Sequence, residues 1–585
     1  MYGYLTIDQA NFLKSVLSQR GITQVKNKMV SDALKLANSI GKSTKNNIKD
    51  ISSVLEYDFS DQAKKDWGIT FTPNNLVKFM YADVLQLNSS ISNIKIADLA
   101  LGNGIFFSEL LFLIKEKKSS FKLVPFIENN LYGYDIKKEN IYLAKLILST
   151  ICVFYGEDTA QIEFKLFEAD SLSLLPEYSF DLIVGNPPYV KQQNINKDYR
   201  NFLKTNFNVI SSNYNLYYAF IEQAIRLLKS DGKILFLLPN YLLKIKSAEI
   251  LRKRLLDKKM FSRIVDFKST QMFSNIGTYS MVLELQENSE YTEYKVLNDN
   301  EKSLDELRKK AWINKKINSY ETINLTSDGE DKLINAVQGQ LYELDISTGI
   351  ATQKDMLYLI DKKAYVNDLN RFKYYKIYKD KVYEIESKLV MKIIKGSRNS
   401  SGANEERFII YPYTLNNGQA NLIDSCTLKK KYPMCYKYFI AAEQELISRS
   451  GVERGNDWYK YGRSQALNRV DPKIIFPTNT VKPQFHYVNE KALFYNGYAI
   501  YGLKNQLSSE LDMQCIEIIL NSKLIERFMK ITSYYIGGGY VSYQKKYLSK
   551  VTIPVLNSNQ KKKLVELKSK KDEVDKMVEK LYGLS

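Results

Sequence analysis

Residues 180–189, Phe180-Asp181-Leu182-Ile183-Val184-Gly185-Asn186-Pro187-Pro188-Tyr189, combine a short apolar run with an abrupt stop. The run before Gly185 predicts a buried strand, because chain-breaking residues follow it at once. Two successive prolines cannot continue the strand, since both lack an N–H group and have a fixed φ angle. We therefore expect Asn186 and Tyr189 at the carboxyl end of this strand, which is the edge of an open α/β sheet where ligands bind.

The residues that leave this strand suit the binding of an exocyclic amino group. The amide oxygen of Asn186 and the carbonyl of Pro187 can accept its two hydrogens, which leaves the nitrogen lone pair free to attack an electrophilic methyl group. The ring of Tyr189 can stack on the attached base, and the rigid pair Pro187-Pro188 holds both acceptors in place before the substrate arrives. Taken alone, the motif is equally compatible with a plain strand and turn, so its interpretation depends on the rest of the chain.

The composition indicates a folded protein with an excess of positive charge. The chain has 585 residues, which is too long for one core and predicts roughly two to four domains. The 84 Lys and Arg residues exceed the 65 Asp and Glu residues and give a formal net charge of +19, which suggests a polyanionic partner. The 43 tyrosines, interleaved with lysines, suit stacking on nucleic-acid bases.

Cysteine and histidine are too sparse for several kinds of site. The four cysteines form no CxxC pair and His486 is the only histidine, so neither a zinc site nor a histidine-dependent triad is expected. The N-terminus lacks the features of a signal peptide, and no run of about 18 apolar residues predicts a membrane span. We expect a cytoplasmic protein with reduced thiols.

Three predicted strands ahead of Asn186 end in acidic residues. Asp98 closes the first strand and is followed by a turn with two glycines, Leu99-Ala100-Leu101-Gly102-Asn103-Gly104. Asp135 and Asp170 close the next two strands. At such strand ends Asp98 could accept from a ligand ammonium group, Asp135 from a ribose diol and Asp170 from an adenine amine. Each acid alone would more often be a helix cap, but three in succession predict a ligand site.

A helix is expected to begin just before the first of these strands, at Thr72-Pro73. Thr72 has the side chain of a good N-cap, and Pro73 suits the first helical position. The N–H groups of such a helix start can bind a carboxylate.

Strands and helices alternate over residues 66–290, which predicts a doubly wound parallel sheet. After Tyr189, a helix is expected at 215–228 and further strands at 234–238, 261–267 and 279–285. The sequence outside this region predicts a helical N-terminal segment at 1–65, a polar linker at 291–334 and a C-terminal helix at 557–585.

The region 335–556 differs in composition from the region before it, because short tyrosine-rich runs that predict strands alternate with lysines. Examples are residues 374–379 and 458–463, and an aromatic loop with three glycines follows at 534–540. Such a pattern can form a nucleic-acid-binding face, with lysines for phosphates and aromatic rings for bases. It is equally typical of a β-rich domain with solvated lysines.

These motifs, in this order, resemble the DNA N6-adenine methyltransferases of the γ class that carry a TaqI-type C-terminal target-recognition domain. The resemblance covers residues 66–290 closely and 335–556 loosely. It implies an α/β fold with a Rossmann-like class I methyltransferase sheet and helices on both faces, followed by a mixed α+β target-recognition domain. The chain departs from the usual family pattern in the glycine turn, where Leu99 follows the acid and Leu101 precedes the first glycine.

The resemblance also implies S-adenosyl-L-methionine (AdoMet) as the cofactor, no metal, and double-stranded DNA as the substrate. Asn186 and Pro187 would bind the target N6, Tyr189 would stack on the flipped adenine, and Phe273 would be a second stacking ring. The residues lining the AdoMet site would be Thr72, Asp98, Leu99, Ala100, Leu101, Gly102, Gly104, Asp135, Asp170 and Pro188. Such enzymes act on DNA in the bacterial cytoplasm, associated with the nucleoid, either beside a cognate restriction endonuclease or as orphan methyltransferases.

Other functions stay open at this point. Enzymes that methylate RNA bases or protein glutamine also use this motif, but they are usually smaller, and the long region after residue 335 favours DNA. A non-catalytic specificity subunit would not need an intact Asn186–Tyr189 segment with three acids. A combined restriction–modification enzyme would need a nuclease, and the N-terminal segment has no convincing cluster of acidic residues with a lysine.

Overall fold

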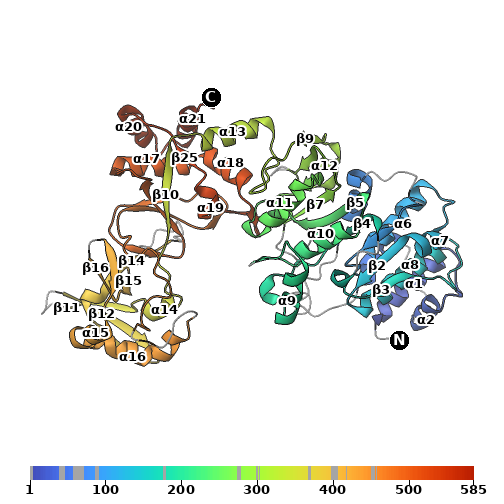
Figure 1. Cartoon of the computed structure of the whole chain (residues 1–585), viewed down its shortest axis with the longest axis horizontal. Helices are drawn as coiled ribbons and strands as arrows, with labels where there is room; N and C mark the ends of the chain where they lie inside the picture. The colour runs from blue at the N-terminus through green and yellow to red at the C-terminus, as the bar shows by residue number, and fades with distance from the viewer. Residues whose placement is uncertain are drawn as a thin grey trace. The chain divides into compact units, whose positions relative to one another are not determined.

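The computed structural model falls into two compact units with separate hydrophobic cores (Figure 1). The first unit comprises residues 1–325 and 534–538, and the second comprises 326–533 and 539–585. The described residues are 4–37, 46–56, 72–85, 91, 93–174, 179–211, 213–272, 279–297, 301, 303–366, 371–396, 406–416, 418–449, 455 and 457–584.

A mixed nine-stranded sheet with the order β3-β2-β1-β4-β5-β7-β6-β8-β9 forms the frame of the first unit. The first five strands in this order run parallel, and β7 lies antiparallel between β5 and β6. The chain order reverses between β1 and β4, so the carboxyl ends of these two strands meet at a switch point, where ligands bind in α/β sheets. The strands are β1 (Ile96–Asp98), β2 (Leu131–Asp135), β3 (Lys165–Glu168), β4 (Phe180–Gly185), β5 (Leu228–Pro239), β6 (Phe261–Asp266) and β7 (Ser280–Leu285).

Strand β4 is buried on both faces, as its apolar run predicts. Leu182 and Val184 belong to the core on one side of the sheet, and Ile183 belongs to the core on the other side. The first core is covered by α1 (Ile7–Ser18), α2 (Lys28–Leu36), α3 (Ile51–Val54), α5 (Asn74–Phe79), α6 (Ile105–Lys117), α7 (Leu123–Asn130) and α8 (Lys138–Phe154). The second is covered by α9 (Lys197–Asn206), α10 (Tyr217–Arg226) and α11 (Glu249–Asp257). The expected Rossmann-like sheet with helices on both faces is confirmed.

Residues 291–334 are not the expected linker, because most of them extend the first unit. They form β8 (Thr292–Val296), which pairs with β6, and β9 (Ile313–Lys315), which pairs with β8, with α12 (Leu304–Lys309) between them. The boundary between the units falls after Leu325. The polar composition that suggested a linker belongs partly to exposed residues of β9 and partly to residues buried in β8. In β8, Thr292 donates to the carbonyl of Phe261 at 2.9 Å, and Lys295 lies over the ring of Trp312.

The second unit is a mixed α+β domain, as expected. Its largest sheet has the order β20-β18-β22-β10-β25, and smaller sheets have the orders β11-β12-β13 and β15-β14-β21. Its strands are β10 (Tyr342–Thr348), β11 (Lys362–Val366), β12 (Arg371–Tyr378), β13 (Lys381–Ile385), β14 (Val390–Lys395), β15 (Arg407–Ile410), β16 (Tyr413–Asn416), β17 (Gln419–Leu422), β18 (Lys473–Phe476), β19 (Asn479–Thr480), β20 (His486–Val488), β21 (Leu493–Tyr495), β22 (Tyr498–Leu503), β24 (Tyr540–Ser542) and β25 (Thr552–Ile553). Its longer helices are α13 (Asp328–Gln338), α15 (Ser425–Lys431), α16 (Pro433–Ile447), α17 (Glu510–Leu520) and α18 (Lys523–Thr532).

The tyrosine-rich run at 458–463 builds part of the core of the second unit and not a base-stacking face. Trp458, Tyr459 and Tyr461 are buried, and the hydroxyls of Tyr459 and Tyr461 donate to backbone carbonyls at 2.5 and 2.7 Å. Lys376 is also buried, with its ammonium group 2.6 Å from Asp361. The composition was compatible with a nucleic-acid-binding face or with a β-rich domain. For residues 457–463, the structure agrees with the β-rich domain.

The C-terminal residues form two helices where one was expected, α20 (Ser558–Glu566) and α21 (Lys571–Leu581). No proline or glycine marks the turn between them, so the sequence pattern gave no sign of it. Leu564 and Val578 are buried, and the hydroxyl of Tyr582 donates to the carbonyl of Thr552 at 2.8 Å, so both helices pack on the second unit. Within the described part of the chain, no helix has the length and apolar character needed to cross a membrane.

Candidate active site

The segment from Asn186 to Tyr189 leaves the sheet at the carboxyl end of β4, beside the end of β1. A Cβ atom at Gly185 would lie only 2.8 Å from the Oδ1 atom of Asp98, and the Gly185 φ angle is 150°. Glycine is therefore needed here, because it lets the strand pass against the Asp98 carboxylate. The predicted amine-binding residue thus directly follows a contact with the first of the three acids.

Asn186 is held by hydrogen bonds at both ends of its carboxamide. Its Nδ2 atom donates to the Oγ1 atom of Thr72 at 3.1 Å, and its Oδ1 atom accepts from the hydroxyl of Tyr189 at 2.6 Å. The same hydroxyl lies 3.0 Å from the carbonyl oxygen of Leu237 in β5. Burial raises the pKa of Tyr189 well above its ordinary value, so this hydroxyl keeps its proton at neutral pH.

Thr72 does not cap the helix that follows it, contrary to expectation. Pro73 occupies the N-cap position of α5, with no side-chain cap, and Asn74 is the first helical residue. The Thr72 hydroxyl bonds to Asn186 instead, and the Thr72 side chain is buried. A contact across 114 positions of sequence has displaced the local cap that the sequence pattern predicts.

Asp98 at the end of β1 is a buried carboxyl group with an open acceptor. Its Oδ1 atom accepts from the N–H of Ala100 at 3.0 Å, while its buried Oδ2 atom has no hydrogen-bond partner within the described residues. Burial raises the pKa of Asp98 to about 7, and the negative charge of Asp135 adds to the effect. An ammonium group would neutralise and hydrogen-bond this oxygen, so the site fits the amino group of AdoMet.

The glycine turn is fixed to the end of β2 by Asp135. The carboxylate of Asp135 accepts from the N–H of Gly102 at 2.9 Å, from the N–H of Lys137 at 2.8 Å and from Nδ2 of Asn140 at 3.1 Å. Gly104 has a φ angle of 82° and starts α6, a backbone conformation that favours glycine. The turn therefore keeps its shape through backbone groups and one acid.

The two leucines that depart from the family pattern belong to the hydrophobic cores of the first unit. Leu99 lies in the core on one side of the sheet and Leu101 in the core on the other. Both side chains are almost fully buried, so these positions can offer a ligand only their backbone groups.

Asp170 has a partner that sequence reasoning missed. Its Oδ1 atom caps the short turn at 171–173 through the N–H of Leu172 at 3.0 Å, and its Oδ2 atom accepts from the hydroxyl of Tyr199 at 2.8 Å. Tyr199 lies in α9, and its ring stacks on Phe202. Nothing in the local pattern around Tyr199 marks it as a site residue, because the contact depends on how α9 packs.

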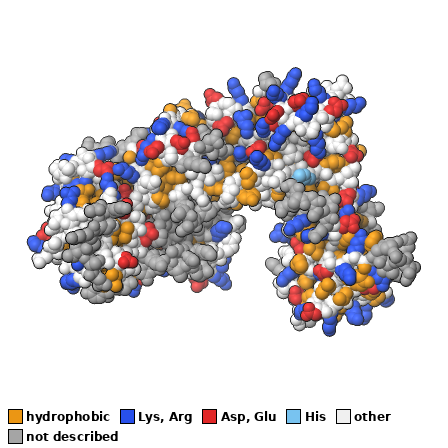
Figure 2. Space-filling model, turned by 180° about the vertical axis from the view of Figure 1, so that it is seen from behind, with side chains coloured by type: hydrophobic (Ala, Val, Ile, Leu, Met, Phe, Trp, Pro, Cys, Tyr) orange, Lys and Arg blue, Asp and Glu red, His pale blue; other side chains and the backbone are white. Residues whose placement is uncertain are grey.

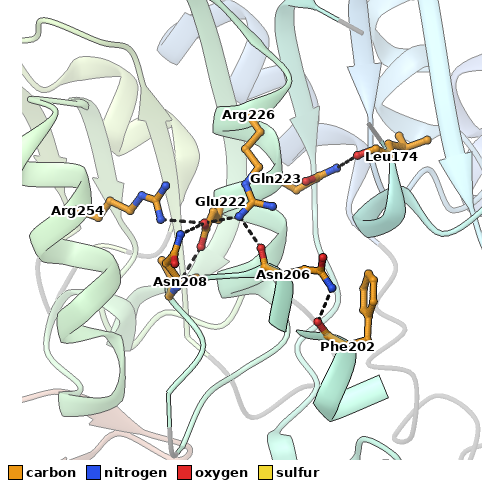
Figure 3. Close-up of polar contacts among 9 residues, drawn as sticks. Leu174, Phe202, Asn206, Asn208, Glu222, Gln223, Arg226 and Arg254 are labelled. Carbon is orange, nitrogen blue, oxygen red and sulfur yellow. Dashed lines mark hydrogen bonds and ion pairs between the residues drawn. The ribbon is translucent and has the colours of Figure 1, made fainter. Parts of the chain in front are cut away.

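Two neighbouring residues of α10, Glu222 and Gln223, bind segments that precede and follow α9, and Figure 3 shows these contacts. Gln223 donates to the carbonyls of Ser171 and Leu174, both at 3.0 Å. The buried carboxylate of Glu222 accepts from Arg226 at 2.7 Å, from Arg254 at 2.8 Å and from the N–H of Val209 at 3.0 Å. Helix α10 therefore fixes both the turn after Asp170 and the segment that follows α9.

The structure brings together most of the side chains that the sequence singled out. Thr72, Asn186 and Tyr189 are in direct contact, and Asp98 and Asp135 flank the glycine turn. Pro187 is buried and Pro188 is half-buried at the same corner. Phe273 lies outside the described residues.

The fold and this cluster are those of a class I methyltransferase-like unit joined to an α+β domain. Residues 129–273 match the family model described as Eco57I restriction-modification methylase. The chain is 24% identical to the Type II restriction enzyme and methyltransferase RM.Eco57I of Escherichia coli, over 84% of this chain and 57% of that protein. It is 21% identical to the Type II methyltransferase M.BstVI of Geobacillus stearothermophilus, over 85% of this chain and 92% of that protein.

Among solved structures, the chain is similar in fold to the Type IIL restriction-modification enzyme MmeI, which was determined in complex with DNA. The match covers 95% of this chain and 82% of that chain, with a TM-score of 0.57 and 13% sequence identity. This chain is therefore similar to Type II methyltransferases, and the resemblance predicted from the order of its motifs is confirmed.

Proposed function

We propose that this protein is a site-specific DNA adenine-N6 methyltransferase that uses AdoMet. The observation that carries the proposal is the position of Asn186, which directly follows Gly185, the residue packed against the open carboxylate of Asp98. The proposed amine-binding residue, Asn186, is thus the chain neighbour of the glycine that packs against the proposed cation-binding residue, Asp98, at the switch point of the sheet. The relatedness to Type II methyltransferases supports DNA as the substrate.

Each residue of the site has a defined role in this proposal. When bound, AdoMet supplies an electrophilic methyl group on a sulfonium centre. Asp98 binds its ammonium group, and Asp135 and Asp170 bind its ribose and adenine. The Oδ1 atom of Asn186 and the carbonyl of Pro187 accept the two N6 hydrogens and orient the nitrogen lone pair.

The aromatic residues hold the target base outside the helix. Flipping an adenine costs a few kcal/mol of unstacking, which stacking against Tyr189 offsets. Phe273 is proposed as the second stacking ring, from its position in the motif order. No strong base is required before the attack, because the amine becomes acidic only once it is methylated.

The second unit is proposed to select the DNA sequence. The net charge of +19 favours DNA binding, but Figure 2 shows Lys and Arg side chains spread over the visible face among acidic ones and not gathered in one patch. A cognate restriction endonuclease is the expected further partner, since the relatives belong to restriction–modification systems.

The proposal is tested by expressing the chain in cells that lack DNA adenine methylation. Mass spectrometry of the nucleosides should detect N6-methyladenine in DNA, and single-molecule sequencing should place it in one sequence motif. A modified base found only in RNA, or methylglutamine found in protein, would contradict DNA adenine as the substrate. It would identify RNA or protein glutamine as the substrate instead.

A further inference from the structure

The carboxamide of Asn186 is held between two hydroxyl groups, and this leaves its orientation open. The Thr72 oxygen can accept from Nδ2, as in the structure at 3.1 Å, or donate to Oδ1 if the amide turns over. The Tyr189 hydroxyl can donate to Oδ1, as in the structure, or donate to the Leu237 carbonyl and accept from Nδ2. Both orientations of the amide therefore satisfy these neighbours.

Only one of the two orientations is productive for binding an amino group. With Nδ2 on Thr72, the Oδ1 atom retains a free lone pair that can accept from the N6 amine, because a carbonyl oxygen accepts two hydrogen bonds. With the amide reversed, an N–H of Asn186 would face an N–H of the substrate, and neither could accept from the other.

We propose that Thr72 is a positioning residue that couples cofactor binding to the orientation of Asn186. This inference rests on the proposed function. If the Thr72 hydroxyl donates its proton to the carboxylate of the cofactor, its oxygen has only lone pairs left for Asn186. The amide must then donate from Nδ2 to Thr72 and turn Oδ1 toward the substrate amine.

Two features of the site support this coupling. Thr72 is buried, its oxygen accepts from Asn186, and its hydroxyl donates no hydrogen bond within the described residues, so its proton is available to a ligand. Asp98 and Thr72 contact successive residues, Gly185 and Asn186, and the ammonium and carboxylate groups of AdoMet are attached to one carbon atom. A cofactor bound through Asp98 therefore brings its carboxylate to the same part of the site.

The test compares DNA duplexes that carry either adenine or purine at the methylated position, because purine lacks only the amino group. Binding is measured with and without saturating sinefungin, an AdoMet analogue that keeps the ammonium and carboxylate groups. In the wild type, sinefungin should increase the preference for adenine over purine by about fivefold, the effect of one hydrogen bond. Thr72→Ser should keep this increase, whereas Thr72→Val and Thr72→Ala should lose it.

The control is Thr150→Val, which removes a buried hydroxyl that bonds only within α8. This variant should behave as the wild type. An unchanged increase in both Thr72→Val and Thr72→Ala would overturn the role of Thr72 while leaving the methyltransferase intact. Absence of N6-methyladenine in DNA from cells that express the wild type would instead overturn the proposed function.

Discussion

At the scale of single residues, Asp98 is the group whose chemistry depends most on its surroundings. It is buried at the end of β1, one oxygen has no partner within the described residues, and its pKa is raised to about 7. In the ligand-free protein the neutral form is therefore favoured below pH 7. Binding of an ammonium group requires the charged form, so proton release and cofactor binding are linked.

We predict that the affinity for AdoMet rises from pH 6 to about pH 7.5 and falls again at higher pH, where the ligand's own ammonium group loses its proton. Below the pKa of about 7 the carboxyl group must lose a proton before it can pair with the ligand, which weakens binding by up to about tenfold per pH unit. Isothermal titration calorimetry across this range measures the effect. Asp98→Asn should bind weakly at every pH, and a wild-type affinity independent of pH would argue against Asp98 as the ammonium ligand.

The sequence predicted where the candidate site residues lie in the fold better than it predicted their contacts. Asp98, Asp135 and Asn186 could be placed at strand ends because acids and chain-breaking residues mark those ends in the local pattern. The bonds from Thr72 to Asn186 and from Tyr199 to Asp170 could not be foreseen, since each joins residues that are distant in sequence. The local sequence pattern predicted Thr72 as a helix cap, but in the structure its hydroxyl accepts a hydrogen bond from Asn186 instead.

At the scale of elements, α10 is the helix that holds the segments around the site. Glu222 is fully buried, while its partners Arg226 and Arg254 are about one-third exposed at 33% and 32%. Together with Gln223 it fixes the segments before and after α9 (Figure 3). Sequence patterning identified α10 as an amphipathic helix but could not show which loops its polar residues bind.

We predict that Glu222→Gln lowers the free energy of unfolding by about 2–3 kcal/mol. The change leaves two guanidinium groups without their carboxylate, but their partial exposure limits the cost to less than that of a fully buried pair. Urea denaturation measures the change, with the same substitution at the exposed Glu163 as the control. Equal stabilities of the two variants would show that the Glu222 network contributes nothing to the fold.

At the scale of the whole molecule, the fold of the first unit could be predicted from its sequence more fully than the fold of the second unit. The central parallel strands β1 and β4 of the first unit are buried almost throughout, and their apolar runs could be located directly. Residues 291–334 were misassigned because β8 buries polar residues, Thr292 and Lys295, that are equally common in a linker. In the second unit the runs rich in tyrosine and lysine were equally compatible with a nucleic-acid-binding face and with a β-rich domain, and the structure buries Trp458, Tyr459 and Tyr461 in the core.

We predict that DNA binding depends steeply on salt and that cofactor binding does not. The excess of 19 positive charges implies contacts to phosphates, which release counterions from DNA and weaken as salt rises. Raising salt from 50 to 200 mM should lower DNA affinity by about 10³-fold or more if roughly six phosphates are contacted. Fluorescence anisotropy measures DNA binding and calorimetry measures AdoMet binding; parallel losses of both would indicate unfolding and not charge screening.

The most direct test of the central claim is the effect of Asn186→Ala on methyl transfer. The transfer is measured with tritiated AdoMet and unmethylated DNA that contains the recognition sequence of the enzyme. We predict that turnover falls by at least about 100-fold, the effect of removing one preorganised hydrogen-bonding group, while calorimetry shows AdoMet affinity within about twofold of the wild type. Turnover equal to that of the wild type would contradict the claim that Asn186 binds and orients the target amino group.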